Sequence, residues 1–214
     1  MMDAKELDAL WQASQIRVTD EIAVAPEVLF CNGSVIGTLG NFSASTGKAK
    51  SKKTFNVCAI VAAALMNGEV LRYVAEFPDD KRTVLYFDTE QSPYHCQKVI
   101  RRALQLAGLP LDHHPDNLIF AQLRAQVPDT RLEIIDRAIA STPNVGLAII
   151  DGIRDLINQG SIRIMRLSVW RREGHKTEDL PDEQADDRQG ERSISVQPRL
   201  LLLIEFSSVR CVYM

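Results

Sequence analysis

Three short apolar segments in the middle of the chain alternate with segments of helical pattern. The apolar segments, Thr83–Asp88, Leu118–Leu123 and Val145–Ile150, have the length and composition typical of strands buried on both faces of a sheet. The helical segments are residues 93–107, with Ser92 as the N-cap, and residues 128–141. Strands joined by such helices pair in parallel, and the helices cover both faces of the sheet. The sequence therefore predicts a three-layer α/β fold with a parallel sheet.

The N-terminal region predicts a helix, a linker and a hairpin. Residues 4–15 carry apolar side chains at helical spacing, which indicates a short amphipathic helix that docks elsewhere or mediates association. Residues 20–27 contain Pro26, and their apolar residues do not recur at the spacing of a helix or a strand, so we expect a linker. Asn32-Gly33, between residues 28–30 and 34–38, is a strong signal for a hairpin turn.

The most informative motif is Gly-Lys-Ala-Lys-Ser-Lys-Lys-Thr at residues 47–54. It has the spacing of a Walker A loop, in which backbone N–H groups converge on phosphate oxygens. Lys53 then reaches the β- and γ-phosphates, and the Thr54 hydroxyl holds Mg²⁺. A strand at residues 41–46 and an apolar helix at residues 55–66 supply the context that this motif requires. The alternative is a solvated, lysine-rich surface turn.

The residues that we expect to contact the nucleotide are those of this loop and of the start of the following helix. They are Gly47, Lys48, Ala49, Lys50, Ser51, Lys52, Lys53, Thr54 and Phe55. Lys52 stands where a second glycine is usual. If that position needs a positive φ, a side chain there costs about 1 kcal/mol. The ammonium group can offset this cost, so we expect nucleotide binding to survive.

Two acidic positions follow predicted strands. Asp151 ends the strand Val145–Ile150 and is the expected Mg²⁺ ligand beside Thr54. Glu90, after Asp88 and Thr89, is the expected catalytic residue that orients and deprotonates the attacking water. In the alternative interpretation, Asp151 caps the next helix, and Asp88 and Glu90 cap the helix that begins near residue 93. Gln91 either helps position the same water or is an ordinary polar turn residue.

These motifs carry a family resemblance over residues 40–156. The segments at residues 47–55, 84–92 and 149–156 resemble the RecA-like P-loop ATPases of the plasmid RepA replicative-helicase group, in particular the AAA ATPase-domain proteins of bacterial plasmids and mobilizable elements. The resemblance implies an ATPase core that binds ATP and Mg²⁺, a ring-like or filament-like homo-oligomer, DNA as a further partner, and a role in DNA replication or mobilisation. By the same resemblance Lys53 is catalytic together with Glu90, and Thr54 and Asp151 bind the metal.

Composition restricts the partners and the compartment. A net charge of −3 gives no overall basic field, so any contact with nucleic acid needs a local patch. No apolar run reaches the roughly 20 residues that span a bilayer, and the acidic N-terminus does not have the pattern of a signal peptide. We therefore expect no membrane partner and a cytoplasmic location. The four scattered cysteines favour reduced thiols over disulfides or a zinc site, namely Cys31, Cys58, Cys96 and Cys211.

The chain divides by pattern into an N-terminal helix and linker at residues 1–27, a RecA-like core at residues 28–157, and an irregular tail at residues 158–214. Residues 163–192 mix arginines with acids, which favours a solvated segment over a nucleic-acid patch. Residues 200–206 form a lone apolar run that is exposed unless it pairs with the sheet. Our hypothesis is that a frameshift or truncated gene copy produced this tail, which translation of the other two frames tests.

The sequence thus favours ATP binding and hydrolysis. The alternatives are a nucleotide-binding assembly module that does not hydrolyse ATP and, less favoured, a P-loop kinase. His113-His114 lies in a predicted turn, where a metal site is less expected than a solvated loop. Cys96 has no neighbour in the sequence that makes it a convincing nucleophile. Neither is assigned a role.

Overall fold

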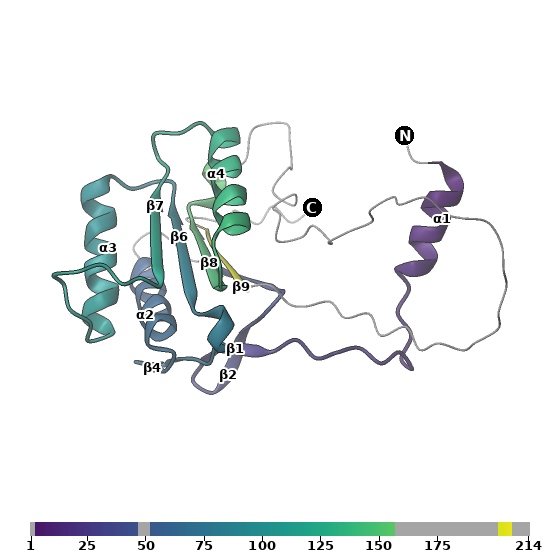
Figure 1. Ribbon diagram of the computed structural model, residues 1–214, viewed down its shortest axis with the longest axis horizontal. Helices are drawn as coiled ribbons and strands as arrows, with labels where there is room; N and C mark the ends of the chain where they lie inside the picture. Colours follow the sequence, from purple (N-terminus) through teal and green to yellow (C-terminus); the bar gives the residue numbers. More distant parts are fainter. Residues whose placement is uncertain (1–2, 47–51, 157–200, 207–214) are drawn as a thin grey trace. The chain divides into compact units, whose positions relative to one another are not determined.

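The computed structural model describes residues 3–46, 52–156 and 201–206 (Figure 1). Residues 47–51 of the predicted phosphate loop, the arginine-rich segment 163–192 and Cys211 lie outside the described residues. The chain divides into two units, and residues 3–24 belong to a different unit from the described residues that follow them. Each unit is considered by itself.

A parallel five-stranded sheet forms the centre of the larger unit. Its strands are β3 (Phe42–Thr46), β6 (Thr83–Asp88), β7 (Leu118–Gln122), β8 (Val145–Asp151) and β9 (Leu201–Phe206). Their order across the sheet is β3-β9-β8-β6-β7, and every neighbouring pair is parallel. The prediction of a parallel α/β sheet is therefore confirmed, and the expected strand at residues 83–88 has the observed bounds.

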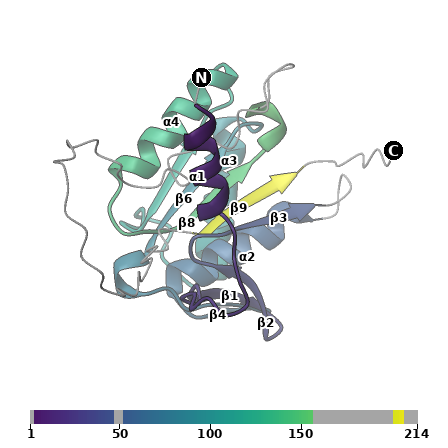
Figure 2. The same cartoon turned by 90° about the vertical axis from the view of Figure 1, so that its right-hand side faces the viewer.

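Strand β9 decides between the two alternatives left open for residues 200–206. Residues 201–206 do pair with the sheet, as a strand between β3 and β8 (Figure 2). The sequence of β9, Leu-Leu-Leu-Ile-Glu-Phe, suits a central strand of a parallel sheet. The run is therefore not a lone, unpaired strand.

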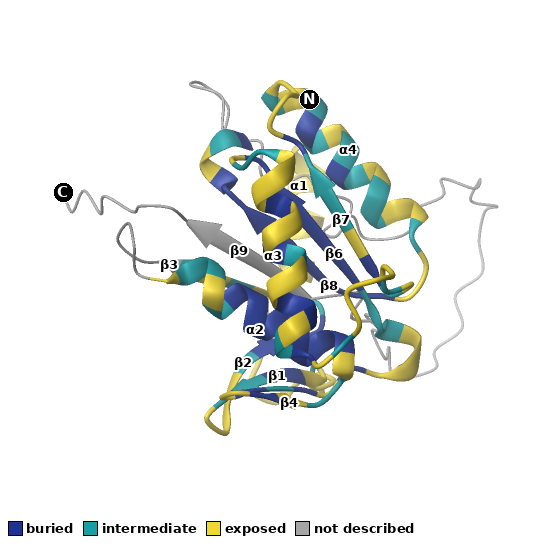
Figure 3. Cartoon of the chain, turned by 90° about the vertical axis from the view of Figure 1, so that its left-hand side faces the viewer, coloured by how far each residue is buried: buried dark blue, intermediate teal, exposed yellow. Residues whose placement is uncertain are grey.

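Helices cover both faces of the parallel sheet, as its all-parallel pairing requires. They are α2 (Lys53–Met66), α3 (Pro93–Leu106) and α4 (Pro128–Ser141). Alternate residues of β6 separate into two cores: Val84 and Tyr86 pack with α2 and α3, whereas Leu85 and Phe87 pack with α4. Strand β8 divides in the same way. The strands β6 and β8 are consequently buried along their length (Figure 3).

A second, antiparallel sheet packs against α2. Its order is β2-β1-β5-β4, with β1 (Glu27–Cys31) and β2 (Ser34–Thr38) forming the predicted hairpin and β4 (Glu69–Val70) pairing with β5 (Tyr73–Ala75). Nine consecutive residues of α2, from Val57 to Leu65, are buried. A helix that is apolar on all sides needs such cover on both sides. Helix α2 is therefore held between the two sheets, which fixes the direction of its N-terminus.

Two short 3₁₀ helices complete the secondary structure of this unit, and Ser92 marks the start of α3. The 3₁₀ helices are η1 (Asp79–Lys81) and η2 (Ile153–Leu156). Ser92 occupies the predicted N-cap position of α3, and its side chain makes no capping hydrogen bond. The Ser92 hydroxyl instead hydrogen-bonds with His95 Nδ1 at 2.9 Å. An imidazole one turn into the helix competes successfully with the backbone N–H groups.

The N-terminal unit contains α1 (Ala4–Ala13), the predicted amphipathic helix. Asp3 and Glu6 form a capping box, in which each side chain accepts a hydrogen bond from the backbone N–H of the other. Local hydrogen bonds therefore define where α1 begins. The apolar side chains of α1 are exposed, including Trp11 at 63%. The expected role of α1 in docking or association stays a prediction.

Candidate functional site

The carboxyl ends of β6 and β8 place two aspartates side by side. Asp88 and Asp151 are register partners in the parallel sheet and are only 0% and 8% exposed. Each lies two residues beyond a side chain of the α2 and α3 core, Tyr86 on β6 and Ile149 on β8. Because side chains alternate along a strand, both carboxylates lie on the sheet face that α2 and α3 cover. Helix α2 on this face begins at Lys53, a residue of the predicted phosphate-loop motif.

Asp151 is held by a tyrosine from the neighbouring strand. The Tyr86 hydroxyl donates a hydrogen bond to Asp151 Oδ2 at 2.9 Å. The Tyr86 ring is itself fixed by stacking on Phe120, with centroids 4.4 Å apart and planes 11° from parallel. This hydrogen bond ties the Asp151 carboxylate to the neighbouring strand β6. Tyr86 thereby fixes the position of the Asp151 carboxylate at the end of β8.

Asp88 stabilises the turn that carries Glu90. Its Oδ1 accepts hydrogen bonds from the backbone N–H groups of Glu90 at 3.0 Å and Gln91 at 2.7 Å. Its Oδ2 accepts from Gln91 Nε2 at 2.8 Å, and Gln122 Nε2 donates to the Gln91 carbonyl at 2.9 Å. Asp88 therefore caps the turn after β6 rather than α3 itself. Gln91 is a structural member of this turn, as the polar-turn alternative predicted.

Thr89 and Gly152 lock the same turn against the end of β8. The Thr89 hydroxyl donates to the Gly152 carbonyl at 2.8 Å, and the Thr89 N–H donates to the Asp151 carbonyl at 3.1 Å. Gly152 has a φ of +93°, and a Cβ atom there would lie 2.3 Å from Thr89 Oγ1 and 2.7 Å from Glu90 Cγ. Only glycine allows this close approach. The backbone around Glu90 is consequently fixed from three directions, by Asp88, by Gln122 and by Gly152.

The Glu90 side chain is exposed and lines a cavity on the α4 side of the sheet edge. The cavity has a volume of about 570 Å³. Its lining, called the arginine pocket below, consists of Thr89, Glu90, Arg124, Pro128, Arg131, Arg154 and Asp155. Glu90 therefore differs from Asp88 and Asp151, whose carboxylates lie on the other face.

The described part of the phosphate-loop motif begins at Lys52. This residue has a φ of 59° and a ψ of 26°, so the position where glycine is usual does adopt the left-handed conformation that the sequence analysis considered. Helix α2 starts at Lys53, two residues earlier than predicted. In this described helix, no side chain caps the N-terminus and no acid lies in the first turn. Thr54 is half-buried and Phe55 is exposed.

Cys96 of α3 lies beside the aspartate pair. Burial, the Asp88 carboxylate with its hydrogen bond to the thiol, and the charge of Asp151 together raise the pKa of Cys96 to about 12. The thiol is therefore protonated at neutral pH, and a protonated thiol is a poor nucleophile. This agrees with the sequence analysis, which gave Cys96 no catalytic role.

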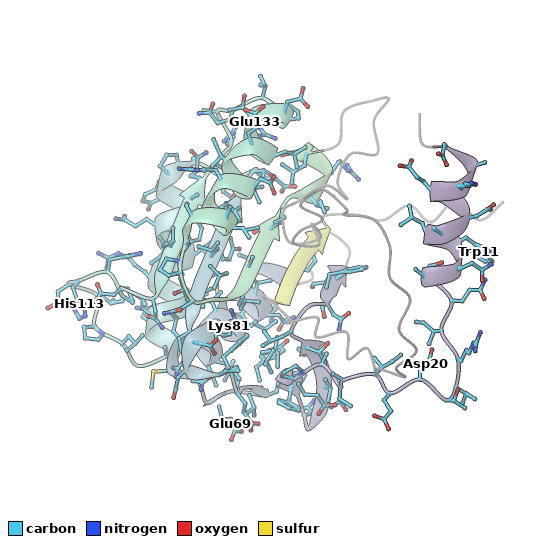
Figure 4. All side chains as sticks on the ribbon, turned by 45° about the vertical axis from the view of Figure 1, so that its right-hand side comes forward. Trp11, Asp20, Glu69, Lys81, His113 and Glu133 are labelled. Atoms are coloured by element: carbon cyan, nitrogen blue, oxygen red, sulfur yellow. The ribbon has the colours of Figure 1, made fainter. Side chains whose placement is uncertain are left out.

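The histidines between α3 and β7 are engaged with their own loop. His114 Nε2 hydrogen-bonds with the Leu118 carbonyl at 2.8 Å, and His113 Nδ1 lies 3.1 Å from Asp112 Oδ1. The hydrogen bond from His113 lowers the pKa of Asp112. The labelled His113 lies at the outer end of this loop (Figure 4). Both rings thus act within the turn itself.

Sequence reasoning missed Tyr86, Gln122, Arg131 and Gly152. Tyr86 had a signal, because it is two residues before Asp88 and so shares its face. The sequence also contains a signal for the burial of Arg131, because this residue lies four positions before the core residue Ile135 and so on the same face of the helix. Gln122 and Gly152 act only through contacts between strands, so no local pattern marks them.

Comparison of the chain with protein-family models gives no match, and comparison with curated proteins gives none either. Within the described residues, no group of three or more His, Cys, Asp or Glu could hold a metal ion. None of the helices in the described ranges has both the length and the hydrophobicity needed to cross a bilayer.

Proposed function

We propose that the chain binds Mg²⁺ and ATP at the carboxyl edge of the parallel sheet and hydrolyses the γ-phosphate. The observation that carries the proposal is the position of Asp151, which ends β8 on the face covered by α2 and neighbours the buried Asp88. In open α/β sheets this edge is where ligands bind. The left-handed Lys52 and the absence of a side-chain cap or a first-turn acid on α2 support phosphate binding at its N-terminus.

The donor set at this edge fits Mg²⁺. Magnesium bound with a nucleotide needs only one or two protein oxygen ligands and keeps several waters. Asp151 and the Thr54 hydroxyl would supply these contacts, whereas both oxygens of Asp88 already accept hydrogen bonds from the Glu90 turn. The ion, when bound, neutralises charge that develops on the phosphates. Tyr86 keeps Asp151 in a fixed orientation for this contact.

The chain's own residues then have separate roles in an in-line attack by water. Lys53 binds the β- and γ-phosphate oxygens, and Glu90 orients the water and accepts its proton. The hydrogen bonds of Asp88 and Gln122 hold the turn on which Glu90 lies. By the resemblance described above, we extend the proposal to a ring-like assembly that serves DNA replication or mobilisation of a plasmid or transposable element.

One observation favours a second candidate function, nucleotide binding without turnover. The Glu90 side chain lines the arginine pocket on the α4 side, away from the face that carries Asp88 and Asp151. A carboxylate that stays in this pocket cannot accept a proton from a water at the other face. The chain would then act as an assembly module whose bound nucleotide stabilises it.

Calorimetric titration with ATP and a turnover assay, each with Mg²⁺, distinguish these possibilities. Lys53→Ala is expected to weaken ATP binding about tenfold or more, because a charge-assisted hydrogen bond contributes about 1.5–3 kcal/mol. Lys98→Ala, at an exposed position of α3, is the control. If Lys53→Ala binds ATP as tightly as the unaltered chain does, the phosphate-loop assignment is wrong.

Glu90→Gln tests the hydrolytic step. It is expected to lower turnover about 100-fold or more and to leave ATP affinity unchanged, since general-base catalysis contributes about 10²–10⁴-fold. Glu133→Gln, at an exposed position of α4 (Figure 4), is the matched control. ATP binding by the unaltered chain without any turnover would favour the assembly module instead.

A further inference from the structure

The arginine pocket has the composition of a site for a charged ligand. Among the described residues, six of the seven that line it are polar or charged, and Pro128 is the exception. The three guanidinium groups and two carboxylates of these described residues sum to a net charge of +1. Ligand pockets in proteins commonly have volumes of about 300–1,000 Å³, and the volume here, about 570 Å³, lies within that range. An apolar ligand would gain little from such walls, whereas an anion would gain from the arginines.

Arg131 is the rigid base of the pocket. Its side chain is buried, with 9% of the residue exposed, and its guanidinium donates to three backbone carbonyls. These are Leu123 at 3.0 Å from Nε, Arg124 at 2.9 Å from Nη2 and Asp155 at 2.8 Å from Nη1. Nη1 also forms an ion pair with Asp155 Oδ2 at 3.8 Å, so part of the Arg131 charge is balanced within the pocket. A guanidinium has five N–H groups, and three of them donate to the carbonyls. Arg131 therefore combines a fixed position with remaining donor capacity.

The rim of the pocket supplies two further cations and a helix terminus. Arg124 and Arg154 are exposed and lie on different segments, the loop after β7 and the 3₁₀ helix η2. Pro128, the first residue of α4, also lines the pocket, and no side chain caps the N-terminus of this described helix. The N-terminal end of a helix carries a partial positive charge. Asp129 in the first turn of α4 offsets part of this charge. Cations from three segments thus meet at one cavity beside this helix end.

We propose that the arginine pocket is a second phosphate-binding site, separate from the phosphate loop. A guanidinium is planar and matches the oxygens of a phosphate with paired hydrogen bonds, and several guanidinium groups around one cavity match a group with three or four oxygens. The separation follows from strand parity. Thr89 directs its hydroxyl to Gly152 and η2 and lines the pocket, whereas its neighbour Asp88 lies on the α2 face.

The ligand is any group that presents a phosphate, whether a small phosphorylated compound or the backbone of a nucleic-acid strand. A phosphate in this pocket would lie beside Glu90, which lines the same cavity, and its negative charge would repel that carboxylate. Occupancy would then change the position of Glu90 and the rate of ATP turnover. This consequence for turnover rests on the proposed function, but phosphate binding itself does not.

The test uses the full chain with the Lys53→Ala substitution, so that the phosphate loop does not dominate binding. Calorimetric titration with inorganic phosphate is compared with and without the added pair Arg124→Gln and Arg154→Gln. The pair is expected to weaken phosphate binding about tenfold or more, because each lost charge-assisted hydrogen bond costs about 1.5–3 kcal/mol. The control pair is Arg102→Gln and Arg137→Gln, at exposed positions of α3 and α4. It is expected to leave phosphate binding unchanged.

A second titration uses a fluorescein-labelled oligothymidylate and fluorescence anisotropy. Binding of the oligonucleotide that depends on Arg124 and Arg154 identifies a nucleic-acid strand as the source of the phosphate, and binding of inorganic phosphate alone identifies a small compound. The proposal is overturned if neither probe binds to the Lys53→Ala chain, or if binding is the same with and without the arginine pair. An unchanged ATP affinity in Lys53→Ala would overturn the proposed function only.

Discussion

The two faces of the parallel sheet carry opposite charges at its carboxyl edge. On the α2 and α3 side, Asp88 and Asp151 are buried and held by N–H and O–H donors. On the α4 side, Arg124, Arg131 and Arg154 line an open cavity. The two environments are one residue apart along the chain, since Asp88 belongs to the first and Thr89 to the second. Strand parity alone thus gives one edge two sites of different chemistry.

The largest expected effect comes from the arginine side. Arg131→Met removes the three hydrogen bonds to backbone carbonyls and the ion pair with Asp155, while the Leu123 carbonyl keeps the Gln126 N–H as a donor. We expect a loss of about 3 kcal/mol in the free energy of unfolding, measured by urea denaturation. Arg137→Met, at an exposed position of the same helix, should cost less than about 0.5 kcal/mol. Equal effects of the two substitutions would show that Arg131 does not brace the loop after β7.

A smaller effect is expected on the acidic side. Tyr86→Phe keeps the ring stack on Phe120 but removes the hydroxyl that donates to Asp151. The expected cost is about 1.5 kcal/mol, since a hydrogen bond to a charged group is stronger than one between neutral groups. The exposed Tyr94 provides the control as Tyr94→Phe, which keeps its ring contact with Lys98. A cost for Tyr86→Phe no larger than that of the control would mean that Asp151 needs no orienting donor.

The effect that is confined to alkaline pH concerns Cys96, whose pKa is raised to about 12 by burial and by the two aspartates. The folded protein keeps this proton above the pKa of about 8.5 of an exposed thiol. The stabilising contribution is therefore complete below about pH 8.5 and is lost as the pH rises toward 12. We expect the unaltered chain to lose more stability than Cys96→Ala between these pH values, as measured by thermal unfolding at a series of pH values.

Alkylation gives an independent measurement of the same thiol. At mildly alkaline pH, iodoacetamide should react with Cys96 more slowly than with the half-buried Cys31. Mass spectrometry of the digested protein distinguishes the two positions. Faster reaction at Cys96 would mean that the aspartate pair does not suppress the thiolate, and the contrast between the two faces would lose part of its electrostatic basis.

Local patterns predicted most of the fold, because apolar period and turn residues determine individual elements. The helix at residues 128–141 and the strand at residues 83–88 have the predicted bounds. The place of β9 could not be predicted in this way, since its partners β3 and β8 are distant in the sequence. The sequence could recognise a strand there but could not say which gap in the sheet it fills.

The candidate site was predictable to the extent that its residues follow strands. Asp88, Glu90 and Asp151 were found because the carboxyl ends of parallel strands meet at one edge. The face of the sheet on which each side chain lies depends on how the turn after β6 is held. Gln122, the last residue of β7, and Gly152, which follows β8, hold this turn in place. The arginine pocket combines three separate segments, so no single stretch of sequence indicates it.

The position of β9 has a consequence for the order of synthesis and assembly. Among the described strands, β3 pairs only with β9, and β9 joins it to β8. A ribosome that has completed β3 and β8 has therefore made the segments on both sides of the proposed nucleotide site without the strand that links them. The sheet that joins β3, which precedes α2 and Thr54, to β8 with Asp151 can form only after residues 201–206 have emerged. A nascent chain would therefore acquire this site late, after most of its helices have been synthesised.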